Sequence, residues 1–195
     1  MIAAAATSDR IRAAALEILE SEGPGSVSMR RIAGALGITP MAIYHHFRNK
    51  EALLHAIVDQ EFAKFHETVE RIPPSGPHGK RLLSILDAYV LYAFRRPRIF
   101  DYVFSERRPD ARRYPEHFRA RGSPTLNQLA DAVSAAMDDG HLRRADVWEV
   151  SLGIWAHVHG FVALSRAGRF SLSQPDFLAL VHRSIKRLLD GLRNP

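Results

Sequence analysis

The sequence contains no cysteine, which excludes disulfide bonds and thiolate metal sites. No stretch approaches the roughly 18 consecutive apolar residues of a membrane-spanning helix. Residues 1–6, MIAAAA, lack a positively charged segment and are too short an apolar run for a secretory signal. A cytoplasmic protein is therefore the expectation.

Motifs of enzymes and cofactor sites are missing as well. There is no Gly-x-Ser-x-Gly elbow, phosphate-binding glycine loop, dinucleotide fingerprint or His-Glu-x-x-His pair. The ten histidines invite a metal site, but His45 and His46 are adjacent and His157 and His159 are two apart. Because metal ligands on a helix share a face at spacings of three or four, neither pair fits. We expect no enzyme, no cofactor and no metal.

The composition of the chain is ordinary for a globular protein, and its charge is compatible with a polyanionic partner. Its 195 residues are 46% hydrophobic and 25% charged, which is enough for a substantial core. The formal net charge is +6, a balance compatible with a polyanion. Apolar residues recur with helical spacing, and no stretch alternates as a strand does. An all-α fold is predicted.

Residues 27–50 have the spacing of two short helices joined by a tight turn. The first helix carries an apolar stripe at spacings of three and four, formed by Met29, Ile32, Ala33 and Leu36. Ser28 is placed to cap this helix, and Gly37 can take the left-handed conformation that ends it. Thr39 then supplies an N-cap, and Pro40 takes the first position of the second helix.

The second helix is expected to bury Ile43 and Phe47 and to expose its N-terminal end and outer side. A helix-turn-helix presents such N-terminal side chains to the DNA major groove, although similar helix pairs also occur in bundles without a DNA function. The exposed set comprises Thr39, Pro40, Met41, Ala42, Tyr44 and His45.

The residues of this stretch resemble the DNA-binding domain of the TetR family of bacterial transcriptional regulators. The resemblance covers roughly the first 60 residues without a gap. It is carried by Met29-Arg30-Arg31-Ile32-Ala33, Leu36-Gly37-Ile38, Ile43-Tyr44-His45-His46-Phe47 and Asn49-Lys50-Glu51-Ala52-Leu53-Leu54. It implies a three-helix DNA-binding domain, assigned to residues 1–50, and a larger helical domain for effector binding and dimerisation, assigned to residues 51–195.

The DNA contacts are expected to divide by role. Candidates for phosphate contacts are Arg30, Tyr44, His46 and Lys50, joined by Ser28 at its helix N-terminus. Contacts to base edges are expected from Thr39, Met41, Ala42 and His45, with Pro40 beside them. Residues 95–121 contain nine arginines and only four acidic residues. They form either a solvated surface or a contact with DNA backbone or an acidic ligand.

The larger domain is expected to enclose an effector pocket, as the resemblance implies. Aromatic residues on converging helices supply its candidate lining: Tyr89, Phe94, Phe100, Phe104 and Trp155, with Met137 and His159 as companions. The simpler interpretation is that these are core residues. The predicted ligand is a small, largely apolar molecule with a polar contact to His159 or Tyr89.

The last two helices are expected to form a homodimer interface, two from each subunit. The run Trp155-Ala156-His157-Val158-His159-Gly160 resembles the Trp-His-Gly signature of one TetR subgroup. Together these features predict a homodimeric repressor that binds a palindromic operator and releases it when the effector binds. Two alternatives stay open: a helical small-molecule binding protein without specific DNA function, and an all-helical enzyme.

Overall fold

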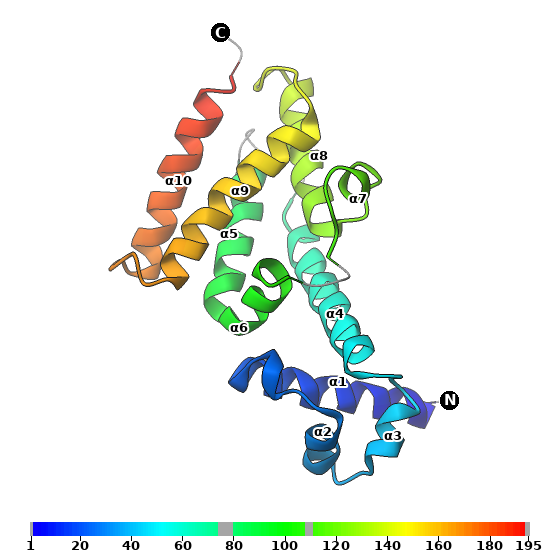
Figure 1. The fold of residues 1–195 in the computed structure, drawn as a ribbon. Coiled ribbons are helices and arrows are strands. Elements are labelled where there is room, and N and C mark those ends of the chain that lie inside the picture. The colour runs from blue at the N-terminus through cyan, green and yellow to red at the C-terminus, as the bar shows by residue number, and fades with distance from the viewer. Residues whose placement is uncertain (1, 74–79, 108–110, 194–195) are drawn as a thin grey trace. The chain divides into compact units, whose positions relative to one another are not determined.

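The structure is a computed structural model that describes residues 2–73, 80–107 and 111–193, with side chains from Thr7 onward (Figure 1). Within these ranges the chain is helical and contains no strand, so the all-α fold predicted from the sequence is confirmed. The chain divides into two compact units. Unit 1 comprises residues 1–64 and 96–110, and unit 2 comprises residues 65–95 and 111–195.

The bounds of the helices are α1 Ile2–Glu22, α2 Met29–Leu36, α3 Pro40–Tyr44, α4 Lys50–Glu70, α5 Lys80–Arg95, α6 Pro97–Phe100, α7 Glu116–Arg119, α8 Pro124–Asp138, α9 Val147–Arg166 and α10 Gln174–Asp190. A π-helical turn at Asp101–Ser105 extends α6. Residues 73–77, PPSGP, have the composition of a linker, and all of them except Pro73 lie outside the described residues.

Helix α1 begins earlier than the sequence suggests. Thr7 and Ser8 have side chains that can cap a helix, but α1 starts at Ile2 and both residues lie inside it. The alanine-rich start has high helix propensity, so the helix continues through it. The Ser8 hydroxyl instead accepts a hydrogen bond from Arg12 at 3.2 Å. Ile11, Ala15, Ile18 and Leu19 form the buried stripe of this helix.

The segment after α5 belongs to unit 1 and packs on the end of α1. Arg96 makes two hydrogen bonds to the Glu20 carboxylate, at 3.0 and 3.1 Å, and one to Glu61 at 2.5 Å. Arg98 donates to the carbonyl oxygens of Glu20 and Ser21. Because the last carbonyls of a helix lack intrahelical partners, Arg98 satisfies the C-terminus of α1.

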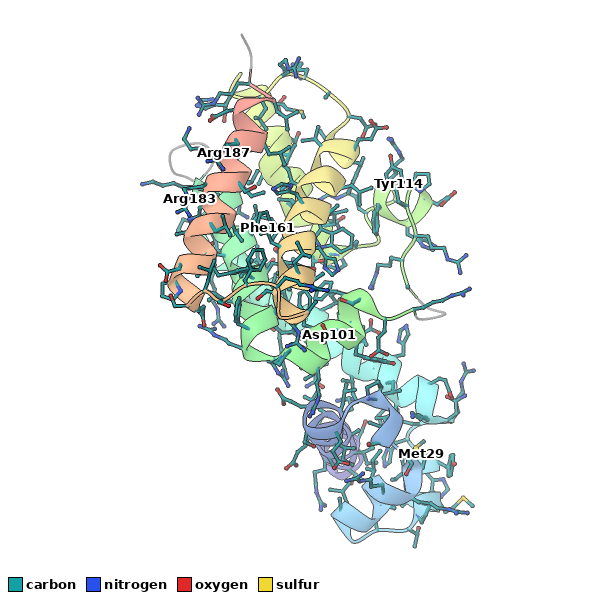
Figure 2. The ribbon with its side chains drawn as sticks, turned by 60° about the vertical axis from the view of Figure 1, so that its left-hand side comes forward. Met29, Asp101, Tyr114, Phe161, Arg183 and Arg187 are labelled. Carbon is teal, nitrogen blue, oxygen red and sulfur yellow. The ribbon has the colours of Figure 1, made fainter. Side chains whose placement is uncertain are left out.

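Unit 2 contains the end of α4 from Phe65 together with α5, α7, α8, α9 and α10, and its main packing is among α5, α8, α9 and α10. Phe161 of α9 contacts Phe170 and Phe177, which joins the end of α9 to the start of α10 (Figure 2). The exposed Arg183 and Arg187 lie four residues apart on α10 (Figure 2).

In the arginine-rich stretch of residues 95–121, Arg119 forms an ion pair with Asp146 at 2.7 Å and Arg121 forms one with Asp131 at 2.9 Å.

Helix α9 is apolar but poorly covered. By length and composition alone it could cross a membrane, yet only 22% of its apolar stretch is buried inside the chain. The buried side carries Ser151, Ile154, Val158 and Val162. A helix that is apolar on more than one side needs cover on more than one side.

Candidate functional site

The two helices of the predicted helix-turn-helix form through the caps expected from the sequence. The Ser28 hydroxyl accepts from the Arg31 amide at 3.2 Å, and the Thr39 hydroxyl accepts from the Ala42 amide at 3.3 Å. Gly37 ends α2 with φ 65°, in the left-handed region that glycine tolerates best. Pro40 occupies the first turn of α3.

Burial separates the inner face of this pair from the outer face. Ile32, Ala33 and Ile43 are 2% exposed or less, and Phe47 is buried beside them. Met41 is 65% exposed and Tyr44 is 48% exposed, the two largest values among exposed large hydrophobic side chains of unit 1. The remaining predicted DNA contacts also reach the surface: Ser28, Arg30, Thr39, Pro40 and His45 are exposed, while Ala42, His46 and Lys50 are partly exposed.

Two basic side chains near α3 are engaged within the protein. Lys50 donates from Nζ to the Pro24 carbonyl oxygen at 2.8 Å, which ties the start of α4 to the turn after α1. Arg31 pairs with Glu22, with one hydrogen bond of 2.7 Å. Since an ammonium group has three donors, Lys50 keeps capacity for a second partner.

Sequence reasoning left out Arg48. This arginine lies between Phe47 and α4 and is exposed. A cation so close to the end of α3 is suited to a phosphate contact. Its position between the buried Phe47 and the capping Asn49 was the signal that could have identified it.

Unit 2 contains a small apolar cavity of about 40 Å³. Its lining comes from α4, α5, α8 and α9 and consists of Phe65, Ile85, Leu86, Tyr89, Thr125, Leu126, Leu129 and Trp155. At one side the Tyr89 hydroxyl is 2.8 Å from Nδ1 of His159. Burial raises the pKa of Tyr89 well above its usual value, so the phenol stays protonated and can donate.

The structure divides the seven residues predicted to line an effector pocket. It brings together Tyr89, Trp155 and His159, with the rings of Trp155 and His159 5.9 Å apart. Phe94 lines a different cavity of about 150 Å³ with Ala93, Val162, Ser165 and Arg166. Met137 is buried on α8 without lining either cavity.

Phe100 and Phe104 belong to unit 1. Their ring centroids are 5.0 Å apart, and Phe104 also contacts Phe62 at 5.5 Å. Among the described residues, the lining of the small cavity comes from unit 2. Six of its eight residues were absent from the predicted set, although helical periodicity marks most of them as buried.

The exposed side of α9 carries a row of small residues, beside the exposed Glu149 and Leu164. Gly153, Ala156, Gly160, Ala163 and Ala167 recur at spacings of three and four and so share one face. Apart from the adjacent residues and the backbone of α9 itself, no atom of the described residues comes within 4 Å of the position that a Cβ would take at Gly153 or Gly160. This face, called the small-residue face below, leaves room for a second backbone to approach closely.

Family comparisons agree with this architecture. Residues 11–57 match the family described as bacterial regulatory proteins, tetR family, and residues 82–188 match the tetracyclin repressor-like C-terminal domain. The second match alone covers more than half of the chain. The chain belongs to the TetR family. This confirms the resemblance seen in the sequence, whereas membership of the Trp-His-Gly subgroup stays a prediction.

Individual TetR-family relatives match the chain over different lengths. The transcriptional regulator UidR of Escherichia coli is 46% identical over 70 residues, which cover 34% of this chain and 36% of UidR. The probable regulator ArpR of Pseudomonas putida is 28% identical over 202 residues, covering 96% and 91% of the two chains. A solved TetR-family regulatory protein from Rhodococcus is 25% identical, with a TM-score of 0.68, and the match covers 96% of this chain and 97% of that protein.

Proposed function

We propose that this TetR-family protein is a transcriptional repressor that binds a palindromic operator as a homodimer and releases it when a small apolar effector binds. It acts on DNA and therefore in the cytoplasm. The observation that carries the proposal is the outer side of the helix-turn-helix. Its inner face is buried, its caps are in place, and its exposed face has no partner in the described chain beyond the caps and the Lys50 and Arg31 contacts.

The expected DNA contacts keep their roles in this proposal. Arg30, Tyr44, His46 and Lys50 face phosphates, while Ser28 adds a hydroxyl at the N-terminus of α2. Lys50 also holds the turn at Pro24, so it positions the domain in addition to contacting DNA. Arg48 is added to the phosphate set because it is exposed beside α3.

Dimerisation is assigned to α9 and α10, and the small-residue face supports it. A palindromic operator requires two recognition helices one turn of DNA apart, roughly 34–36 Å. A face of glycine and alanine lets two helices approach closely, and the second copy would cover the apolar side of α9 that the chain itself leaves exposed.

An oligomer measurement tests this interface. Ala156→Arg places a long charged side chain on the small-residue face and is expected to give a monomer by sedimentation equilibrium. Ala135 is also an exposed alanine on a helix, but it lies on α8, so Ala135→Arg should leave the dimer intact. A dimer that survives Ala156→Arg would rule out this face.

The effector site is assigned to the cavity beside Tyr89, Trp155 and His159. Its volume of about 40 Å³ holds about three water molecules, far below the roughly 300 Å³ of an ordinary ligand site. The effector must therefore enlarge the cavity by moving the helices that line it. Phe65 of α4 is one of the lining residues, so enlargement acts directly on the helix that also begins at the DNA-binding domain.

This gives the effector a means to change DNA affinity. A ligand can shift a conformational equilibrium only by as much as it prefers one conformation. A molecule that fits only the enlarged cavity binds only the conformation with that cavity, and it therefore shifts the equilibrium toward this conformation. The expected effector is largely apolar, with one polar group that the Tyr89–His159 pair can contact.

Selection of a binding sequence from random duplex DNA is the decisive experiment. The proposal predicts a two-fold symmetric consensus bound by the dimer, with affinity that falls steeply as salt rises. Tyr44→Ala should weaken binding to that consensus without changing the oligomer. Enrichment of no sequence would instead favour a helical small-molecule binding protein, for which the scarcity of long polar side chains on α3 is the argument.

A further inference from the structure

The N-terminal half of the recognition helix α3 offers almost no hydrogen-bonding side chains. Thr39, Pro40, Met41 and Ala42 occupy the cap and the first turn, the part that enters the major groove in a helix-turn-helix. Pro40 and Ala42 have no polar side-chain atom. Any sequence read by this turn must therefore be read through Thr39 or through apolar contact.

Thr39 caps the helix end. Its hydroxyl oxygen accepts from the Ala42 amide at 3.3 Å, which holds the side chain against the first turn and leaves its single O–H donor for a base edge. Tyr44 and His45 carry polar groups, but they lie at the last turn of α3 and after it. The long side chain at the entering end of the helix is that of Met41.

Met41 is placed unusually for a methionine. It is 65% exposed, the highest value among the exposed large hydrophobic side chains in the described part of the chain. Exposed apolar surface at a DNA-reading position gains free energy when an apolar group covers it. In the major groove, the apolar group that base pairs present is the 5-methyl group of thymine.

We infer that Met41 determines operator specificity by packing on thymine 5-methyl groups in each half-site. Its unbranched thioether has three rotatable bonds and adapts to a methyl group at the groove floor. Pro40 and Ala42 complete an apolar surface from which a cytosine amino group would lose its water without finding an acceptor. The inference rests on the proposed DNA-binding function.

Uracil substitution tests the contact, because deoxyuridine pairs as thymidine does but lacks the methyl group. In the selected operator, each thymine is replaced singly by uracil and binding is measured by fluorescence anisotropy at fixed salt. At one thymine or more per half-site, uracil is expected to lower the affinity of the wild-type dimer about fourfold, the factor for one methyl group removed from water.

The Met41→Ala variant then assigns the contact. It should bind the thymine and uracil operators equally, whereas Met41→Leu should keep part of the preference. Leu172→Ala serves as the matched control, since Leu172 is also an exposed hydrophobic residue but lies in unit 2. That variant should discriminate as the wild type does.

Each failure has its own meaning. If selection yields no consensus, the proposed function itself is lost. If a consensus exists but uracil is tolerated at every position, the function stands and the methyl contact is overturned. If the uracil effect persists in Met41→Ala, a residue other than Met41 reads the methyl group and the assignment is wrong.

Discussion

Replacing Arg96 with alanine is expected to lower the free energy of unfolding of unit 1 by about 2–3 kcal/mol. Arg96 joins α1 and α4 to the start of α6 through its bonds to Glu20 and Glu61. The Glu61 carboxylate is 1% exposed, so the pair is effectively buried on one side. The guanidinium is 23% exposed and stays in contact with water.

The magnitude follows from what remains after the substitution. Removing one partner of a buried ion pair costs about 3–5 kcal/mol, because the other charge keeps its desolvation penalty. Here Lys64 Nζ still lies 3.0 Å from Glu61, and solvent can enter the space that Arg96 leaves. Both effects reduce the cost below that range, to about 2–3 kcal/mol.

Urea unfolding followed by circular dichroism measures the loss, and native-state hydrogen exchange locates it. The exchange protection of the last turn of α1 and of α6 should fall, because Arg96 contacts Glu20 there. Arg121→Ala is the matched control. Its bidentate pair with Asp131 has similar geometry, but both side chains are more than half exposed, so the expected cost is below about 1 kcal/mol.

A double-mutant cycle of Arg96→Ala with Glu61→Gln completes the test. The coupling energy should exceed about 1 kcal/mol, since the two groups are in direct contact. If Arg96→Ala costs no more than Arg121→Ala, burial of Glu61 does not govern the strength of this pair. The reasoning from burial to magnitude would then be refuted.

Three further outcomes are expected. Gly37→Ala should destabilise the protein by about 1–2 kcal/mol, because φ 65° is unfavourable for a residue with a Cβ; equal thermal stability of Gly34→Ala and Gly37→Ala would contradict this. Thr39→Ala should cost about 1 kcal/mol through loss of the α3 cap and should be largely rescued by Thr39→Ser, as denaturant titration would show. The Arg119 hydrogen bond and the α9 amides lower the pKa of Asp146, so its contribution to stability is present above the unfolded pKa near 4 and lost as pH falls through the folded pKa. The stability difference between wild type and Asp146→Asn should therefore shrink in urea titrations below about pH 4, and a constant difference would oppose it.

Local features of this protein follow from the amino-acid order. These features are hydrogen bonds between groups three or four residues apart in the chain, namely the caps at Ser28, Thr39 and Ser173 and the helix end at the left-handed Gly37. Such interactions form whatever the rest of the chain does, so sequence patterns report them reliably. The family resemblance of residues 29–54 has the same origin, because the helix-turn-helix is a local motif.

The start of α1 shows where this local reasoning is incomplete. Thr7 and Ser8 can cap a helix, but a capping residue competes with the helix propensity of the residues before it. Four alanines precede Thr7, and the helix extends through them to Ile2. Composition upstream of a cap decides whether the cap is used.

Tertiary structure alone decided which distant residues meet. Tyr89 and His159 are 70 residues apart, Arg96 and Glu61 are 35 apart, and Lys50 finds its acceptor 26 residues earlier at Pro24. Periodicity shows that a residue is buried but not against which helix. That is why Phe100 and Phe104 were grouped with Tyr89 from their aromatic character, although the chain path places them in the other unit.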